Sequence, residues 1–289
     1  MRRTTVIAAF GLALLAPMVA RADEAAGHYN LGLQYKREGK TAEAIGECLS
    51  AIKLRPDYAA AHATLGNLYR ANGDYQKAAG EYEITVKLQP KDAQAHANLG
   101  AAYARIKRPD DGIRELETSI GIADDYDAEI SLGMAYKQKG DYKHAIEHDE
   151  KATTLKPNEA QGWANLGIVK SVADDKEGAI AAFRKALALK PNDAELHFGL
   201  GVIYRRQRKT DEAIAQYQVA VQKDPHYAKA YYDLGVMYSQ ERKGPEARAA
   251  FEKYIEYGAQ EDAEHRKDAE DRLKTFKGYS DGQAAHPSK

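Results

Sequence analysis

The sequence has 289 residues but only one cysteine, Cys48, so no disulfide can form within the chain. Its 42 basic and 43 acidic residues nearly balance, which argues against a nucleic-acid partner or attachment to a membrane surface. An apolar stretch without charge runs from Val6 to Ala20, shorter than the ~20 residues that span a bilayer. We therefore expect no disulfide, no nucleic acid and no membrane span once the N-terminal segment is removed.

The N-terminal segment has the pattern of a secretory signal peptide. Arg2 and Arg3 precede the apolar stretch, and Ala20 and Ala22 form a small-x-small cleavage site after it. We predict that residues 1–22 are a signal peptide and that the protein is periplasmic, with full secretion as the second choice.

A Leu-Gly pair recurs through the rest of the chain at intervals of 34 residues, with one interval of 33. The pairs are Leu31-Gly32, Leu65-Gly66, Leu99-Gly100, Leu132-Gly133, Leu166-Gly167, Leu200-Gly201 and Leu234-Gly235. Most units also have Tyr three residues after the Gly and Ala twelve residues after it, and five end in Pro. Self-similarity at such a period predicts a solenoid.

These offsets of Leu-Gly, Tyr, Ala and Pro resemble the tetratricopeptide repeat family over about residues 25–258. The resemblance implies an all-α fold, a right-handed solenoid of helix-turn-helix units. We expect seven units, at 25–58, 59–92, 93–125, 126–159, 160–193, 194–227 and 228–258. A capping helix should follow at 259–276, and a disordered tail at 277–289.

The composition of a unit has a physical reason. Gly inside a helix costs about 0.5–1 kcal/mol relative to Ala, so seven such glycines indicate close approach of a second helix. A single hairpin cannot bury its apolar face, and each unit therefore needs its neighbours.

The first helices should present a polar row to the concave groove of the solenoid. The residues predicted to line it are Asn30, Arg37, Asn67, Asn98, Arg105, Asn165 and Arg206. An Asn amide can donate and accept hydrogen bonds with a peptide backbone, and Arg can hold carboxylates. The Asn row resembles the asparagine ladder of O-GlcNAc transferases, although a solvated helix face would explain it as well.

We interpret the chain as a non-enzymatic scaffold that binds a protein or an extended peptide, with envelope assembly or export as one possible setting. The alternatives are a targeting subunit for an O-GlcNAc-transferase-like glycosyltransferase and self-association through the concave face. Apart from one histidine motif, the sequence shows no phosphate loop, nucleophile elbow, metal-ligand set or catalytic carboxylate pair. We expect no cofactor and no metal.

That motif, His144, Glu147 and His148, spells H-x-x-E-H as in inverted zincins, and a metal-dependent hydrolase is a further alternative. We expect both histidines on the outer surface of a second helix, without a third ligand. A separate row, His28, His62, His96 and His197, stands where the family usually has an aromatic residue, and we expect it at a helix interface.

The fourth unit departs from the pattern. Glu129 and Asp149 stand where sister units have apolar or aromatic residues, and Lys170 replaces the Tyr of the next unit. Because an unpaired buried charge costs about 3–5 kcal/mol, we predict a structural ion pair between Asp149 and Lys170. Local irregularity that exposes both side chains to solvent is the alternative.

Overall fold

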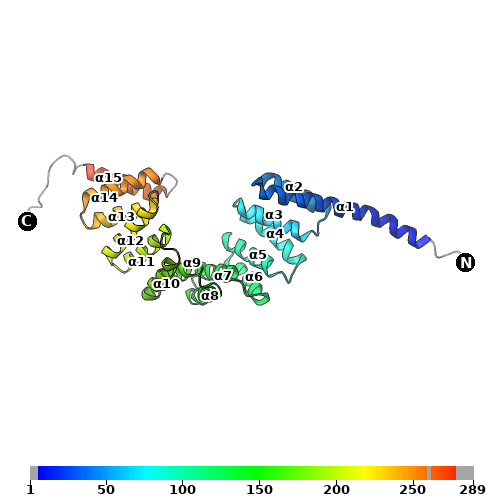
Figure 1. Ribbon diagram of the computed structural model, residues 1–289, viewed down its shortest axis with the longest axis horizontal. Helices are drawn as coiled ribbons and strands as arrows, with labels where there is room; N and C mark the ends of the chain where they lie inside the picture. The colour runs from blue at the N-terminus through cyan, green and yellow to red at the C-terminus, as the bar shows by residue number, and fades with distance from the viewer. Residues whose placement is uncertain (1–5, 259–261, 278–289) are drawn as a thin grey trace, which may run out of the picture. The chain divides into compact units, whose positions relative to one another are not determined.

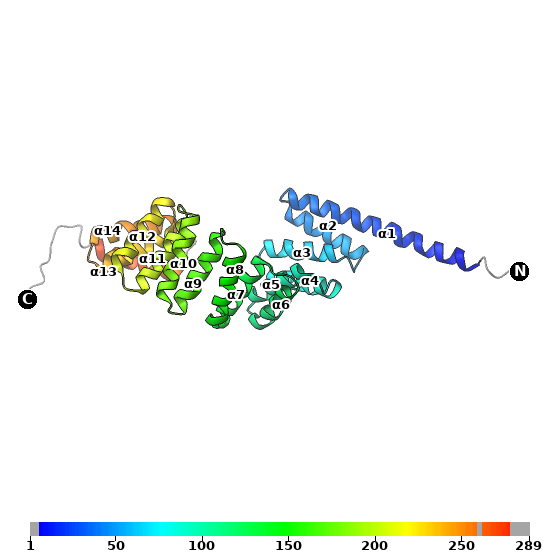
Figure 2. The same ribbon diagram turned by 60° about the horizontal axis from the view of Figure 1, so that its bottom comes forward.

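The computed structural model describes residues 6–258 and 262–277, and the side chains of 21–258 and 262–276. Within these residues every regular element is an α-helix and no strand occurs, which confirms the all-α prediction (Figures 1 and 2). The helices are α1 (Val6–Arg37), α2 (Thr41–Leu54), α3 (Ala59–Ala71), α4 (Tyr75–Leu88), α5 (Ala93–Arg105), α6 (Pro109–Ile122), α7 (Tyr126–Lys139), α8 (Tyr142–Leu155), α9 (Ala160–Val172), α10 (Lys176–Leu189), α11 (Ala194–Arg206), α12 (Thr210–Lys223), α13 (Ala228–Gln240), α14 (Gly244–Tyr257) and α15 (Ala263–Lys277).

The chain divides into two compact units, each made of several repeats and called the first and the second unit below. The first ends at Leu155 and the second begins at Lys156. In the first unit each odd-numbered helix packs against the next helix as a hairpin, and α2, α4 and α6 also contact the first helix of the following hairpin. In the second unit α9 to α14 repeat this arrangement, and α15 packs against α14. This stacking in sequence order confirms the predicted α-solenoid.

A residue with a left-handed backbone joins the two helices of each hairpin. These residues are Gly39, Gly73, Lys107, Gly140, Asp174, Arg208 and Arg242, with φ between 58° and 83°. Glycine adopts this conformation without cost, whereas other residues lose roughly 1–2 kcal/mol. The shared turn fixes the same crossing of the two helices in each hairpin.

The Leu-Gly glycines allow the close packing of each hairpin. A Cβ atom at Gly66 would lie 2.6 Å from the ring of Tyr82 on α4, and one at Gly201 would lie 2.6 Å from Tyr217 on α12. Both tyrosines are fully buried. The missing side chain of the first helix thus makes room for a large one on the second.

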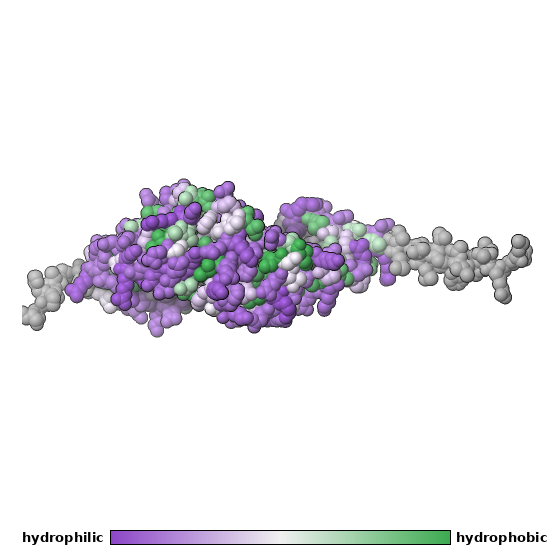
Figure 3. Space-filling model, turned by 90° about the horizontal axis from the view of Figure 1, so that it is seen from below, coloured by the Kyte–Doolittle hydropathy of each residue, from purple (hydrophilic) through white to green (hydrophobic). Residues whose placement is uncertain are grey.

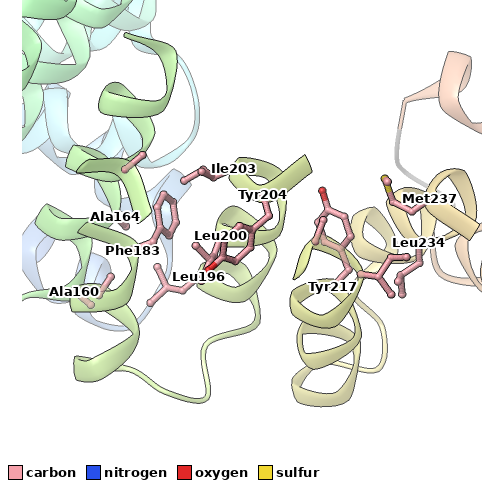
Figure 4. Packing of buried hydrophobic residues seen from close by; sticks show 14 of the residues in the cluster. Ala160, Ala164, Phe183, Leu196, Leu200, Ile203, Tyr204, Tyr217, Leu234 and Met237 are labelled. Carbon is pink, nitrogen blue, oxygen red and sulfur yellow. The ribbon is translucent and has the colours of Figure 1, made fainter. Parts of the chain in front are cut away.

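A hydrophobic cluster runs through the second unit from α9 to α14 (Figure 4). Phe183 of α10 lies beside Leu196 and Ile203 of α11, and Tyr217 of α12 lies beside Leu234 of α13. Because this one cluster contains residues of successive hairpins, no hairpin buries its apolar surface alone.

The N-terminal prediction remains open. Residues 1–5 of the predicted signal peptide lie outside the described residues, and the rest of it forms the start of α1. No described helix has the length and apolar character needed to cross a bilayer. Cleavage and export stay predictions, and so do the boundaries of the seven repeats, the cap and the tail. Residues 259–261 of the predicted cap and 278–289 of the predicted tail lie outside the described residues.

Candidate functional site

A hollow of about 330 Å³ opens on the second unit, where α9, α11 and α13 present side chains to the same side. Its apolar wall consists of Ala164, Ile168, Val172, Phe183, Leu196, Phe198, Val202, Ile203 and Tyr227. Polar groups at its edge belong to Gln161, Ser171, Asp193, Glu195, Arg206 and Lys229. Small-molecule and peptide sites share this combination of an apolar floor and a few polar groups.

The depth of this hollow depends on a glycine in α11. A Cβ atom at Gly199 would lie 2.5 Å from the ring of Phe183, so the bare backbone allows that ring to form the floor. Ile168 and Val172 of α9 remain 40% and 38% exposed at the edge. The face seen in Figure 3 is mostly hydrophilic, with scattered hydrophobic patches. The hollow therefore offers apolar surface to a ligand.

The charged groups around the hollow are not equally available. Asp193 caps α11, because its Oδ1 accepts from the backbone N–H groups of Glu195 at 3.0 Å and Leu196 at 3.2 Å. Arg206 is exposed and donates only long hydrogen bonds, 3.4 Å each, to the carbonyl and hydroxyl oxygens of Ser171. Lys229 is also exposed. The two cations can thus turn toward an anionic group.

A second hollow of about 270 Å³ adjoins the first and shares Phe198, Val202 and Lys229 with it. Its other lining residues are Arg205, Tyr232, Asp233, Tyr254 and His265. Arg205 donates to Asp233 at 3.1 Å, and Asp233 is only 7% exposed. Burial raises the pKa of Asp233, while Arg205 and Tyr217 oppose that rise. The second hollow thus combines the apolar and aromatic side chains of Phe198, Val202, Tyr232 and Tyr254 with a buried ion pair.

Three family models, each described as a tetratricopeptide repeat, match this chain. One matches residues 63–127 and 164–228, the second 204–267 and the third 130–159. The chain belongs to the tetratricopeptide repeat family. No curated protein matches it.

Solved structures of tetratricopeptide repeat proteins share this fold. A repeat protein from Parabacteroides merdae is 17% identical with a TM-score of 0.70, over 88% of this chain and 99% of its own. YrrB, described as having an unusual peptide-binding site, is 18% identical with a TM-score of 0.50, over 63% of this chain and 95% of its own. The Cut9-Hcn1 complex of the APC/C gives 23% identity and a TM-score of 0.59 over 74% of this chain. The present chain spans only 43% of the length of the chain in that structure.

Two of the residues predicted to line the groove lie in the second unit of this tetratricopeptide repeat protein. Arg206 lines the first hollow directly. Asn165 accepts a hydrogen bond of 2.8 Å from the amide of Gln161, which also lines that hollow. The set of predicted groove residues did not include Phe198, Gly199 or Lys229, and only the unusual glycine before Leu200-Gly201 signalled the depth of the site.

The other five predicted residues lie in the first unit, each with its own surroundings. Asn67 accepts a hydrogen bond of 2.8 Å from the buried Tyr82, and Asn98 accepts one of 3.3 Å from Gln94. The guanidinium of Arg105 lies 5.2 Å from the centre of the Tyr75 ring. Asn30 and Arg37 are exposed on α1. Ligand contact by these residues stays a prediction.

Three histidines of the row pair with carboxylates inside their hairpins, and the fourth pairs with an amide. Nδ1 of His62 lies 2.6 Å from Oε2 of Glu81, and Nδ1 of His96 lies 2.8 Å from Oε2 of Glu115. Nε2 of His62 also lies 3.0 Å from the carbonyl oxygen of Pro56, which can only accept. Nε2 therefore donates the hydrogen bond to Pro56. His28 pairs with Glu47 at 2.6 Å, and His197 with the amide oxygen of Gln216 at 2.9 Å.

The prediction that His144 and His148 both lie on the outer surface is wrong for His148. This ring is buried because its Nδ1 lies 2.6 Å from Oε2 of Glu129, a fully enclosed carboxylate of α7. His144 is exposed and pairs with Asp141 at 2.6 Å. Both rings stack on Tyr136. Among the residues that the structure describes, no group of three or more His, Cys, Asp or Glu could hold a metal ion.

Asp149 occupies a packed position of the first unit. It is 3% exposed, lies against Gly133, and has its pKa raised to about 7 by burial, with Lys137 opposing the rise. Its predicted partner, Lys170, belongs to the second unit, so the ion pair stays a prediction. The surroundings of Asp149 within its own unit favour the neutral carboxyl group.

Proposed function

We propose that this tetratricopeptide repeat protein is an exported, periplasmic scaffold that binds an extended segment of a partner protein along α9, α11 and α13. The apolar hollow on these helices is the observation that carries the proposal. Repeat solenoids present their inner helices as binding surfaces, and members of this family are generally scaffolds without catalytic activity. Partners in the cell envelope follow from the predicted signal peptide.

Two features support an extended ligand. The exposed apolar residues Ile168 and Val172 lie along one helix face, with Arg206 and Lys229 nearby on the following inner helices. An extended chain crossing these helices can place one side chain in the hollow while its backbone reaches polar groups at the edge. The peptide-binding site in the description of YrrB is compatible with this use of the fold, although the 18% identity carries the fold alone.

Site-specific photocrosslinking in living cells tests the proposal. A photoreactive amino acid at Ile168 should capture a partner protein, whereas one at Leu189, a similarly exposed apolar residue on α10, should not. Capture from Leu189 but not from Ile168 would contradict binding at the hollow. Cell fractionation with N-terminal sequencing of the mature protein tests export separately, and an uncleaved cytoplasmic chain would contradict it.

A further inference from the structure

The two hollows of the second unit form a pair separated by a ridge of Phe198 and Val202, which line both. The first lies between α9 and α11, and the second continues from α11 to α13 and α15. The hollows lie on either side of α11, so they are spaced by about one helix diameter, roughly 10 Å. A peptide that crosses α9, α11 and α13 in this order meets both hollows.

The spacing selects a backbone conformation. A polyproline II segment rises ~3.1 Å per residue with three residues per turn, so side chains i and i+3 point the same way about 9 Å apart. A β-strand would place side chain i+3 on the opposite side. A polyproline II segment therefore fits side chains i and i+3 into the two hollows.

The chemistry of the two hollows differs. The floor of the first is Phe183 and Leu196, both buried and apolar, which suits an aliphatic or aromatic side chain. In the second, Arg205 pairs with Asp233 at 3.1 Å and Nδ1 of His265 lies 3.9 Å from Oδ2 of Asp262, which leaves the charge of Lys229 to face a ligand. The ring of His265 lies against Tyr232, 4.5 Å between centres. The surplus charge of the second hollow is positive, so it suits a carboxylate.

We infer that the second unit recognises a polyproline II segment of a partner protein with an apolar or aromatic residue followed three positions later by Asp or Glu. The first side chain fills the apolar hollow, and the carboxylate meets Lys229 at the second. This inference rests on the proposed function and specifies the partner that the same surface would select.

Selection from a library of random linear peptides displayed on phage tests it with the full chain. The wild-type protein should enrich peptides with an apolar or aromatic residue and an acidic residue three positions later. Ile168→Glu should abolish enrichment, because it places a carboxylate at the edge of the apolar hollow. Met134→Glu is the matched control, since Met134 also stands two residues after its Leu and is 41% exposed, but lies in the first unit.

A charge reversal tests the second hollow. Lys229→Glu should bind a selected peptide about tenfold more weakly and should remove the difference between that peptide and its version with the acid replaced by the amide. Lys223→Glu, at an exposed site of α12, should leave both unchanged.

The outcomes separate the two proposals. Enriched peptides that lack the acidic position, or carry it at another spacing, and that are lost in Ile168→Glu overturn the inference while the proposed function stands. If wild type and Ile168→Glu enrich the same peptides, or wild type enriches none, the proposed function fails and the inference with it.

Discussion

In the pair of Glu129 and His148 the carboxylate is on the first helix and the imidazole on the second, the reverse of the neighbouring hairpins. Exchanging the two side chains tests whether the pairing itself stabilises the hairpin, whichever helix carries each partner. In α3 and α4 the His is on the first helix and the Glu on the second, as His62 and Glu81, whereas α7 carries Glu129 and α8 carries His148. The double variant Glu129→His with His148→Glu restores the order of the neighbouring hairpins. We expect it to fold with nearly wild-type stability.

The single variants should behave differently. His148→Glu places two carboxylates together at a site where the Glu129 side chain is 2% exposed, and Glu129→His places two imidazoles there. Loss of the partner of a buried charge costs about 3–5 kcal/mol, so we expect each single variant to lose stability in that range. The double variant should lose only about 1 kcal/mol, because the stacking of His148 on Tyr136 disappears. The coupling between the two sites should then be about 5 kcal/mol or more.

Urea unfolding followed by circular dichroism measures the three variants, and hydrogen exchange of the α7 and α8 amides provides a local value where the array does not unfold in one step. Glu147→His, on the exposed side of α8, is the control and should change stability by less than about 0.5 kcal/mol. If the losses of the single variants simply add in the double variant, the two side chains are not coupled and the argument fails.

Three further changes have definite expected results. Gly66→Ala should lower the free energy of unfolding by about 1–3 kcal/mol in urea titrations, since its Cβ would lie 2.6 Å from the Tyr82 ring; an unchanged midpoint would contradict this. Lys107→Gly should raise stability by up to about 1 kcal/mol because φ is 61° there, and a loss would show that the turn is not strained. Burial raises the folded-state pKa of Asp149 from its ordinary value of 3.8 to about 7, so the folded protein binds more protons than the unfolded one. The stabilisation that the protonated Asp149 contributes should be fully present below about pH 4. Up to about 4 kcal/mol of it should be lost as the pH rises through 7, and Asp149→Asn should remove this pH dependence. A wild-type stability that rises over this range would instead indicate the ion pair with Lys170.

The sequence predicted the fold well because one packing arrangement repeats. Gly66 and its counterparts could be assigned to close helix contacts from spacing alone. The site was only partly predictable: the helical face of Arg206 follows from its register, but the depth of the hollow depends on how Phe183 meets Gly199 across two helices. Spacing also could not show that Tyr82 donates a hydrogen bond to Asn67, since that depends on the course of one side chain.

Register could not place His148 either. Its position beside the packed residues of α8 is compatible with an exposed side chain. The ring is buried because it pairs with the enclosed carboxylate of Glu129. A buried carboxylate in a first helix is therefore a better signal for a buried histidine than the periodicity of the second helix.

The orientation of these pairs bears on how such an array can evolve. Each His–carboxylate pair is contained in one hairpin, so duplication, deletion or shuffling of whole hairpins keeps every pair intact. A genetic crossover between α7 and α8 would join Glu129 to the glutamate of another hairpin, or His148 to its histidine. Recombination between repeats at this point should therefore be confined to breakpoints in the loops between hairpins.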